Sequence, residues 1–185
     1  MPHSWGAVLR AKSRRPCDFV WDPEVILAKT GYEPHGGQLE FHGCPARFRL
    51  LACGRRWGKT IAAVNEAIRL SVRNSGSVGW IVAPTYSQVM KDWREMMKYL
   101  PREAIRSVHR GERYIELRNE SATWFKSADR PDNLRCEGLD WLIVDEAPMV
   151  KRAAWEEALR PTLVDKRGKA IFIGTPKGRN WFYEL

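Results

Sequence analysis

The sequence has no hydrophobic run long enough to cross a lipid bilayer, and it has few cysteines. No stretch reaches the roughly 18 consecutive apolar residues of a membrane-spanning helix, and no apolar core follows the charged start as in a secretory signal. The four cysteines, Cys17, Cys44, Cys53 and Cys136, form no CxxC pair and match no zinc-site spacing. We therefore expect no membrane span, no zinc site and reduced thiols.

Internal repeats and low-complexity tracts are also lacking. Of the 185 residues, 44% are hydrophobic and 29% are charged, which is the balance of a soluble globular protein and excludes a disordered chain. The length favours one domain with a single sizeable core. Residues 1–20 are basic and irregular, so we expect a flexible arm there and one domain over 21–185.

Acidic residues are outnumbered by basic ones. Lys and Arg number 31 and Asp and Glu number 22, which gives a net charge of +9 and indicates an anionic partner such as nucleic acid. The alternative is a soluble protein that is merely basic. Arginines gather in the middle of the chain, where they predict either a DNA-facing or subunit-facing edge or a solvated face: Arg102, Arg106, Arg110, Arg113 and Arg118.

Continuous apolar runs alternate along the chain with segments whose apolar residues recur at helical spacing. The pattern predicts a short helix over 23–30 capped by Asp22, a loop at 34–37 and a hairpin within 107–125 with its turn near Asn119. Buried strands are predicted at 47–53, 78–83, 139–145 and 169–174, and helices at 59–73, 87–100 and 151–164, the last interrupted at Pro161. Such alternation predicts an α/β fold with a mostly parallel central sheet and helices on both faces, whose ligands bind at the carboxyl ends of the strands.

A phosphate-binding loop follows the first of these strands. It consists of Cys53, Gly54, Arg55, Arg56, Trp57, Gly58, Lys59 and Thr60. Backbone N–H groups of such a loop face phosphates, Lys59 reaches the β- and γ-phosphates, Thr60 offers a hydroxyl to Mg²⁺, and Gly58 lets the backbone approach closely. Cys53 departs from the usual pattern, which has glycine there. ATP and Mg²⁺ are the predicted ligands, against the alternative of an ordinary strand–turn–helix.

Two acids end the strand at 139–145. Asp145 fits the carboxylate that holds the Mg²⁺ shell, through water or through Thr60. Glu146 could orient and deprotonate a water that attacks the γ-phosphate, which favours hydrolysis over transfer to a substrate. The alternative is a pair of solvated carboxylates at a strand end.

These motifs resemble, in type and order, the ATPase domain of the large terminase subunit of tailed bacteriophages, the motor that packs DNA into a procapsid. The resemblance covers roughly residues 30–185 and adds three segments to the loop and the acidic pair: 82–86 (VAPTY), 127–135 (SADRPDNLR) and 174–178 (GTPKG). It implies a RecA-like P-loop fold of the additional-strand catalytic-glutamate type. A phosphate loop that begins with Cys or a small residue is common in that family.

The resemblance also implies roles for single residues. Gln38 matches the glutamine that recognises adenine, Arg55 the loop arginine that senses the γ-phosphate, and Thr175 the coupling motif that links phosphate loss to movement. Arg135 matches an arginine offered in trans to the neighbouring subunit's nucleotide, where it would neutralise charge on the transferred phosphoryl group. Arg130, in the same segment, is the competing candidate, and a surface ion pair is the alternative for both.

The same resemblance implies partners and a setting. The partners are double-stranded DNA, held through its backbone without sequence preference, the portal and the small terminase subunit. The chains are expected to be monomeric in isolation and to form a homo-oligomeric ring when assembled. The setting is the procapsid in the cytoplasm of an infected bacterial host. Large terminase subunits normally continue into a nuclease domain with clustered metal-binding carboxylates. This sequence contains no such cluster, so we expect no DNA cleavage from it, and its ATPase domain is expected to be shorter than usual at its C-terminal end.

Two other functions remain open from the sequence. One is a nucleotide-gated DNA-binding or assembly module that does not hydrolyse ATP appreciably on its own, for which Glu146 would have no use. The other is a helicase-like DNA remodeller, which would need a second core domain.

Overall fold

The computed structural model describes residues 20–129, 134 and 138–185. The predicted arm over 1–20 lies outside the described residues except for Val20, and so do Arg130 and Arg135. Within the described part of the chain, no helix is long and apolar enough to cross a membrane.

The helices and strands follow the predicted alternation. The α-helices are α1 (Pro23–Ala28), α2 (Gly36–Gly43), α3 (Lys59–Arg73) and α4 (Tyr86–Tyr99). The single 3-10 turns are η1 (Arg102–Ala104), η3 (Ala147–Met149) and η5 (Pro161–Leu163), and η4 (Ala154–Leu159) is a six-residue π-helix. The strands are β1 (Phe48–Ala52), β2 (Val78–Ala83), β3 (Ile105–His109), β4 (Tyr114–Leu117), β5 (Ala122–Ser127), β6 (Trp141–Val144) and β7 (Lys169–Gly174).

One seven-stranded sheet organises the fold, in the order β1-β7-β6-β2-β5-β4-β3. The first five strands in this order run parallel, and β4 and β3 extend the sheet as an antiparallel meander. The last strand in the sequence, β7, lies between β1 and β6 and pairs with both. The carboxyl ends of these three strands therefore meet at one edge.

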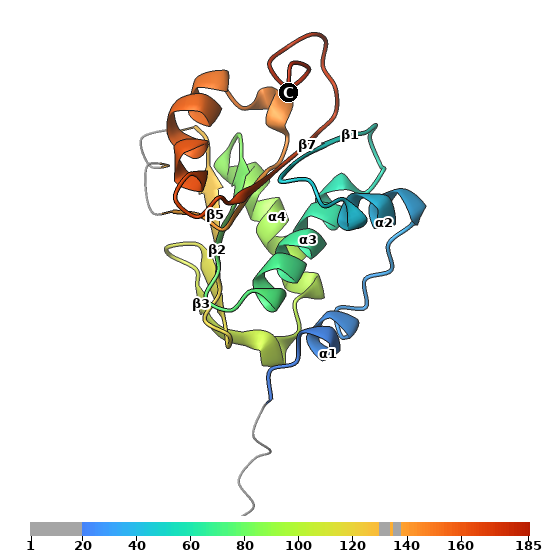
Figure 1. Ribbon diagram of the computed structural model, residues 1–185, viewed down its shortest axis with the longest axis vertical. Helices are drawn as coiled ribbons and strands as arrows, with labels where there is room; N and C mark the ends of the chain where they lie inside the picture. Colours follow the sequence, from blue (N-terminus) through green and yellow to red (C-terminus); the bar gives the residue numbers. More distant parts are fainter. Residues whose placement is uncertain (1–19, 130–133, 135–137) are drawn as a thin grey trace, which may run out of the picture.

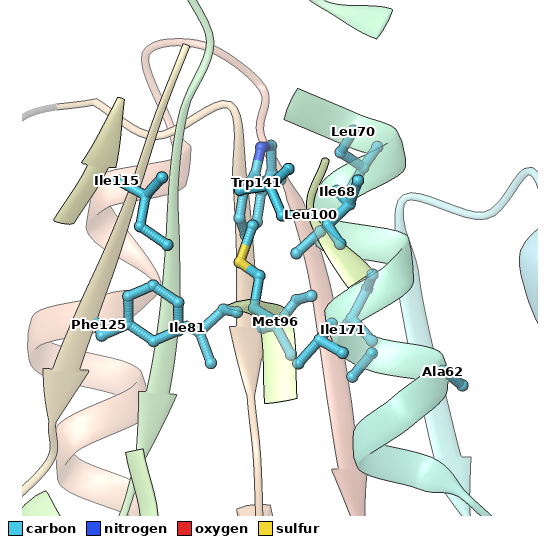
Figure 2. Packing of buried hydrophobic residues seen from close by; sticks show 14 of the residues in the cluster. Ala62, Ile68, Leu70, Ile81, Met96, Leu100, Ile115, Phe125, Trp141 and Ile171 are labelled. Carbon is cyan, nitrogen blue, oxygen red and sulfur yellow. The ribbon is translucent and has the colours of Figure 1, made fainter. Parts of the chain in front are cut away.

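Two hydrophobic clusters cover the two faces of the sheet. One lies under α3 and α4, and Figure 2 shows Ile81, Phe125, Trp141 and Met96 packed together in it. The other lies under the segment from η3 to η5, drawn in orange on the opposite side of the sheet in Figure 1. The prediction of helices on both faces is thus confirmed.

Local signals account for most element boundaries. The Asp22 carboxylate accepts hydrogen bonds from the backbone N–H groups of Glu24 and Val25, which caps α1 as predicted. The predicted hairpin is confirmed as β4 and β5, with β3 as a third strand. The predicted helix over 151–164 is interrupted at Pro161, where η5 begins.

Two local predictions are wrong. The strand at 47–53 is not fully buried: β1 lies at the sheet edge, so Phe48 and Leu50 are exposed while Arg49 and Leu51 are buried. The loop predicted at 34–37 ends early, because α2 begins at Gly36. The Gln38 side chain accepts a hydrogen bond from the backbone N–H of His35 and so completes the start of that helix.

A buried ionic network ties α2, α3 and β1 together. Glu66 on α3 is fully buried and forms ion pairs with Arg49 at 2.6 Å, with Arg69 at 2.8 Å and with the His42 ring at 2.7 Å. Burial by itself raises the pKa of Glu66, but the hydrogen bonds from His42 and Arg69 and the charge of Arg49 outweigh it and lower this pKa to about 2.

We predict that Glu66→Gln destabilises the protein by about 3–5 kcal/mol at pH 7, because Arg49 is left buried without its counter-charge. Since the pKa of Glu66 is lowered in the folded state, its contribution is present above the ordinary value of 4.5 and is lost as the pH falls toward about 2. Urea denaturation should therefore show a smaller difference between wild type and variant at pH 3 than at pH 7.

Glu24→Gln serves as the matched control, because Glu24 pairs with Arg73 at 3.0 Å on the surface. It should change the unfolding free energy by less than about 1 kcal/mol. An equal effect of Glu66→Gln at both pH values would contradict the role of the buried network.

Candidate functional site

The phosphate loop connects the end of β1 to the start of α3. Gly58 adopts a φ of +89° directly before α3, and a Cβ at this position would lie 2.8 Å from Nε2 of Gln38. The backbone conformation therefore favours glycine, and a Cβ would in addition displace the Gln38 side chain. The Lys59 ammonium donates hydrogen bonds to the carbonyls of Cys53 at 2.9 Å and Gly54 at 2.8 Å, so it lies across the loop.

The start of α2 packs against this loop. Nε2 of Gln38 donates to the Gly58 carbonyl at 3.3 Å, and the His35 ring contacts the Trp57 indole edge to face with 4.7 Å between ring centroids. Gln38 is only 5% exposed, so its side chain supports the loop from the buried side. The buried network around Glu66 holds α2 in this place through His42, one turn after Gln38.

The acidic strand end lies beside the loop. Thr60 Oγ1 lies 3.4 Å from Asp145 Oδ2, although 85 residues separate them in the sequence. The other carboxylate oxygen of Asp145 accepts the backbone N–H of Glu146 at 2.7 Å. Burial raises the pKa of Asp145, while its hydrogen bonds to Asp92, Glu146 and Thr60 oppose this shift.

Glu146 lies on a tight turn that leaves the sheet. Its φ of 47° and ψ of 42° fall in the left-handed region, where a residue with a Cβ is strained by roughly 1–2 kcal/mol. The turn is held close to β7, because a Cβ on Gly174 would lie 2.3 Å from Cδ of Pro148. Close packing of η3 on the end of β7 thus fixes the backbone that carries Glu146.

A cavity of about 540 Å³ opens at this edge of the sheet. The loop, the acidic turn, the end of β7 and one side of α4 form its wall: Arg55, Arg56, Gly58, Lys59, Thr60, Ile61, Gln88, Lys91, Glu95, Glu146, Met149, Thr175 and Lys177. Cationic groups from three elements face a region that also contains two carboxylates and two hydroxyls. A polyphosphate fits this combination of charge and loop geometry.

Known proteins share this architecture. No protein-family model matches the chain. It is 39% identical to the large terminase subunit of Thermus phage G20c over 94% of its length, and 32% identical to that of Escherichia phage T5 over 86%. Among solved structures, the large terminase ATPase domain of Thermus phage P74-26 superposes with a TM-score of 0.78 at 38% identity, covering 85% of this chain and 71% of that domain.

The chain belongs to the large terminase family. It aligns with the ATPase domain, and it spans only 39% of the length of the G20c relative. The HK97 large terminase, at a TM-score of 0.71 and 13% identity, shares the fold. The predicted family and fold class are therefore confirmed, including the additional strand of the terminase ATPase domain, which is β7 between β1 and β6.

The terminase fold brings most of the predicted site residues to the cavity. Arg55, Arg56, Gly58, Lys59, Thr60, Glu146 and Thr175 form part of its wall. Asp145 lies just behind the wall, at hydrogen-bond range of Thr60. Cys53, Gly54 and Trp57 belong to the same loop, and Gln38 contacts it from α2. Arg135 lies outside the described residues, so its predicted role stays a prediction.

The sequence analysis missed the contribution of α4. Gln88, Lys91 and Glu95 recur at helical spacing and line the cavity, but the apolar pattern of this helix gave no sign of a site. Asp92 was missed as well. It is 2% exposed, its Oδ2 has no hydrogen-bond partner among the described residues, and the neighbouring Asp145 raises its pKa. A charged residue within the buried stripe of a helix was the only available signal.

The surroundings of Asp92 favour its protonated form over the carboxylate. Burial raises its pKa far above the ordinary value, and the neighbouring charges of Asp145 and Glu146 raise it further. A protonated Asp92 can donate a hydrogen bond to the Asp145 carboxylate, which explains how two buried carboxyl groups of this terminase domain lie in contact.

We predict that Asp92→Asn leaves the unfolding free energy within about 1 kcal/mol of wild type, because the amide also donates to Asp145. Asp92→Ala removes this donor and should cost about 1–3 kcal/mol. Urea denaturation of both variants at pH 7 without nucleotide measures the difference. Marked stabilisation by both substitutions would show that wild-type Asp92 is charged and repels Asp145.

Proposed function

We propose that this chain is the ATP-hydrolysing motor domain of a large terminase, which drives double-stranded viral DNA into a procapsid. One observation carries the proposal: Thr60 of the phosphate loop lies 3.4 Å from Asp145, and Lys59 and Glu146 line the same cavity. Loop, metal-binding acid and water-activating acid thus converge, as hydrolysis of a nucleoside triphosphate requires. Structures of the large terminase of a thermophilic bacteriophage, 16% identical to this chain, hold ADP and ATP-γ-S.

Phosphate binding is the task of the loop. Lys59 donates to two loop carbonyls, and it would exchange these bonds for the β- and γ-phosphate oxygens of ATP. Backbone N–H groups at the start of α3 and the dipole of this 15-residue helix add to the attraction. Gln38 would recognise the adenine, and Arg55 would sense the γ-phosphate.

The side chains present fit Mg²⁺. The Thr60 hydroxyl and the Asp145 carboxylate are oxygen donors on one side of the cavity, and they would hold Mg²⁺ together with phosphate oxygens and water. When bound, Mg²⁺ would neutralise charge on the β- and γ-phosphates. Among the described residues, no cluster of three or more His, Cys, Asp or Glu could hold a metal ion by itself, which agrees with a site completed by the nucleotide.

Hydrolysis needs a base beside the γ-phosphate. Glu146 would accept a proton from a water molecule while the water oxygen bonds to the γ-phosphorus and the bond to the β,γ-bridging oxygen breaks. ADP and inorganic phosphate are the products. Thr175, which follows β7, would report the loss of the γ-phosphate to the rest of the motor.

The partners complete the proposal. Arg135 would be offered to the nucleotide of the neighbouring subunit in a homo-oligomeric ring, with Arg130 as the competing candidate. The basic surface would hold DNA through its phosphates, the portal and the small terminase subunit would assemble with the ring, and packaging would take place in the host cytoplasm.

We predict that Glu146→Gln retains ATP binding but lowers phosphate release by roughly 100-fold or more, because the general base is removed. Lys59→Ala should instead weaken ATP binding by roughly tenfold or more through loss of charge-assisted hydrogen bonds. Binding of a fluorescent ATP analogue and release of inorganic phosphate separate the two effects. Equally slow release by wild type and Glu146→Gln, with ATP binding intact, would favour the nucleotide-gated assembly module.

We predict that Arg135→Ala lowers hydrolysis in assembled rings by on the order of 1,000-fold. Mixing Arg135→Ala with Lys59→Ala subunits should restore part of the activity, because Lys59→Ala subunits still offer Arg135 to intact neighbouring sites. Arg130→Ala is the matched control and should hydrolyse ATP at nearly the wild-type rate. A full rate for Arg135→Ala in rings would contradict the trans role.

A further inference from the structure

A second cavity lies on another side of α4. This groove of about 510 Å³ runs between α4 and the turn that joins β3 to β4. Tyr86, Met90, Trp93, Arg94 and Met97 form one wall, and Val108, Arg110 and Arg113 form the other. The first wall follows α4 for about 17 Å, the length of three helical turns. Of the described residues, none lines both this groove and the nucleotide cavity.

The groove has an apolar floor and a cationic rim. In the floor, Trp93 is buried and Met90 and Met97 are half-buried, whereas Tyr86 is 49% exposed and Val108 is 36% exposed. Methionine and aromatic side chains are characteristic of surfaces that receive a partner's apolar side chains.

The rim arginines are not engaged by acids of the described ranges. There, Arg94, Arg110 and Arg113 form no ion pair, while the nearby Arg106 pairs with Glu116 at 3.1 Å. The Arg113 guanidinium lies over the Tyr86 ring at 4.4 Å from its centroid, which holds it at the edge of the groove. The groove lining that the structure describes contains no acidic side chain.

We propose that this groove binds an amphipathic helix with acidic flanks, contributed by a partner protein. Apolar side chains spaced by three or four residues would fill the floor, and flanking carboxylates would pair with the three arginines. The shape favours this occupant, since a helix of about 12 residues matches the length of the α4 wall.

Two other occupants fit less well. Duplex DNA presents mainly charged phosphates to such a surface, and phosphates that face the Met and Trp floor would lose hydration without gaining hydrogen bonds. A second copy of this chain brings a net charge of +9 toward an arginine rim, which opposes association.

Helix α4 connects the groove to the nucleotide cavity. Lys91 and Glu95 of this helix line the nucleotide cavity, and Met90 and Arg94 line the groove. A partner seated in the groove would therefore contact the helix that forms a wall of the ATP site.

The test uses a fluorescent peptide of about 14 residues with leucines at helical spacing and glutamates on both flanks. Fluorescence anisotropy should show saturable binding to the full chain. Arg94→Glu and Arg110→Glu should each weaken it by roughly tenfold or more. Arg102→Glu, an equal charge change at an exposed position outside the groove, should leave it unchanged within about twofold.

Two control ligands separate the alternatives. A peptide of identical composition with its leucine spacing scrambled should bind at least roughly tenfold more weakly, because it cannot fill the floor with one face. Equal binding of the scrambled peptide, no binding of the designed peptide, or no effect of the two groove variants would overturn the proposal. The proposal would also be overturned if Arg94→Glu and Arg110→Glu abolished the binding of duplex DNA but not that of the peptide.

Discussion

The nucleotide site forms because β7 pairs with both β1 and β6. Its register sets Gly174 beside Ala52 at the end of β1 and Phe172 beside Val144 at the end of β6. The phosphate loop and the acidic turn leave the sheet from these two neighbours. Because parallel strands end at the same edge, a strand formed by residues 169–174 brings together Thr60 and Asp145.

Two buried acids show how surroundings decide the chemistry of one functional group. Glu66 on α3 is enclosed by Arg49, Arg69 and His42, so it remains charged and braces α2 against the sheet. Burial of Asp92 on α4 and the charge of Asp145 both raise the pKa of Asp92, so its protonated form is favoured. The first arrangement holds α2 against the phosphate loop, and the second sets the surroundings of Asp145 at the end of β6.

Helix α4 joins the regions of functional interest. Its buried stripe packs on the sheet, a second side lines the nucleotide cavity, and a third lines the arginine-rimmed groove. A helix that serves three surfaces has little freedom to move at one of them alone. Any displacement of α4 during nucleotide turnover would therefore alter both cavities.

Local sequence pattern was sufficient to predict the elements and the chemistry of the loop. Alternating apolar runs specify the parallel strands, and the loop and acidic residues at 53–60 and 145–146 follow their strands directly. The edge position of β1 escaped prediction, because an apolar run does not reveal how many neighbours its strand has. Packing in three dimensions then chose which distant groups meet: Asp92 with Asp145, and Gln38 with Gly58. A carboxyl group on a helix has the same local pattern whether its neighbour is an arginine or another acid, so its charge, and with it its part in the site, is fixed by neighbours that the fold supplies.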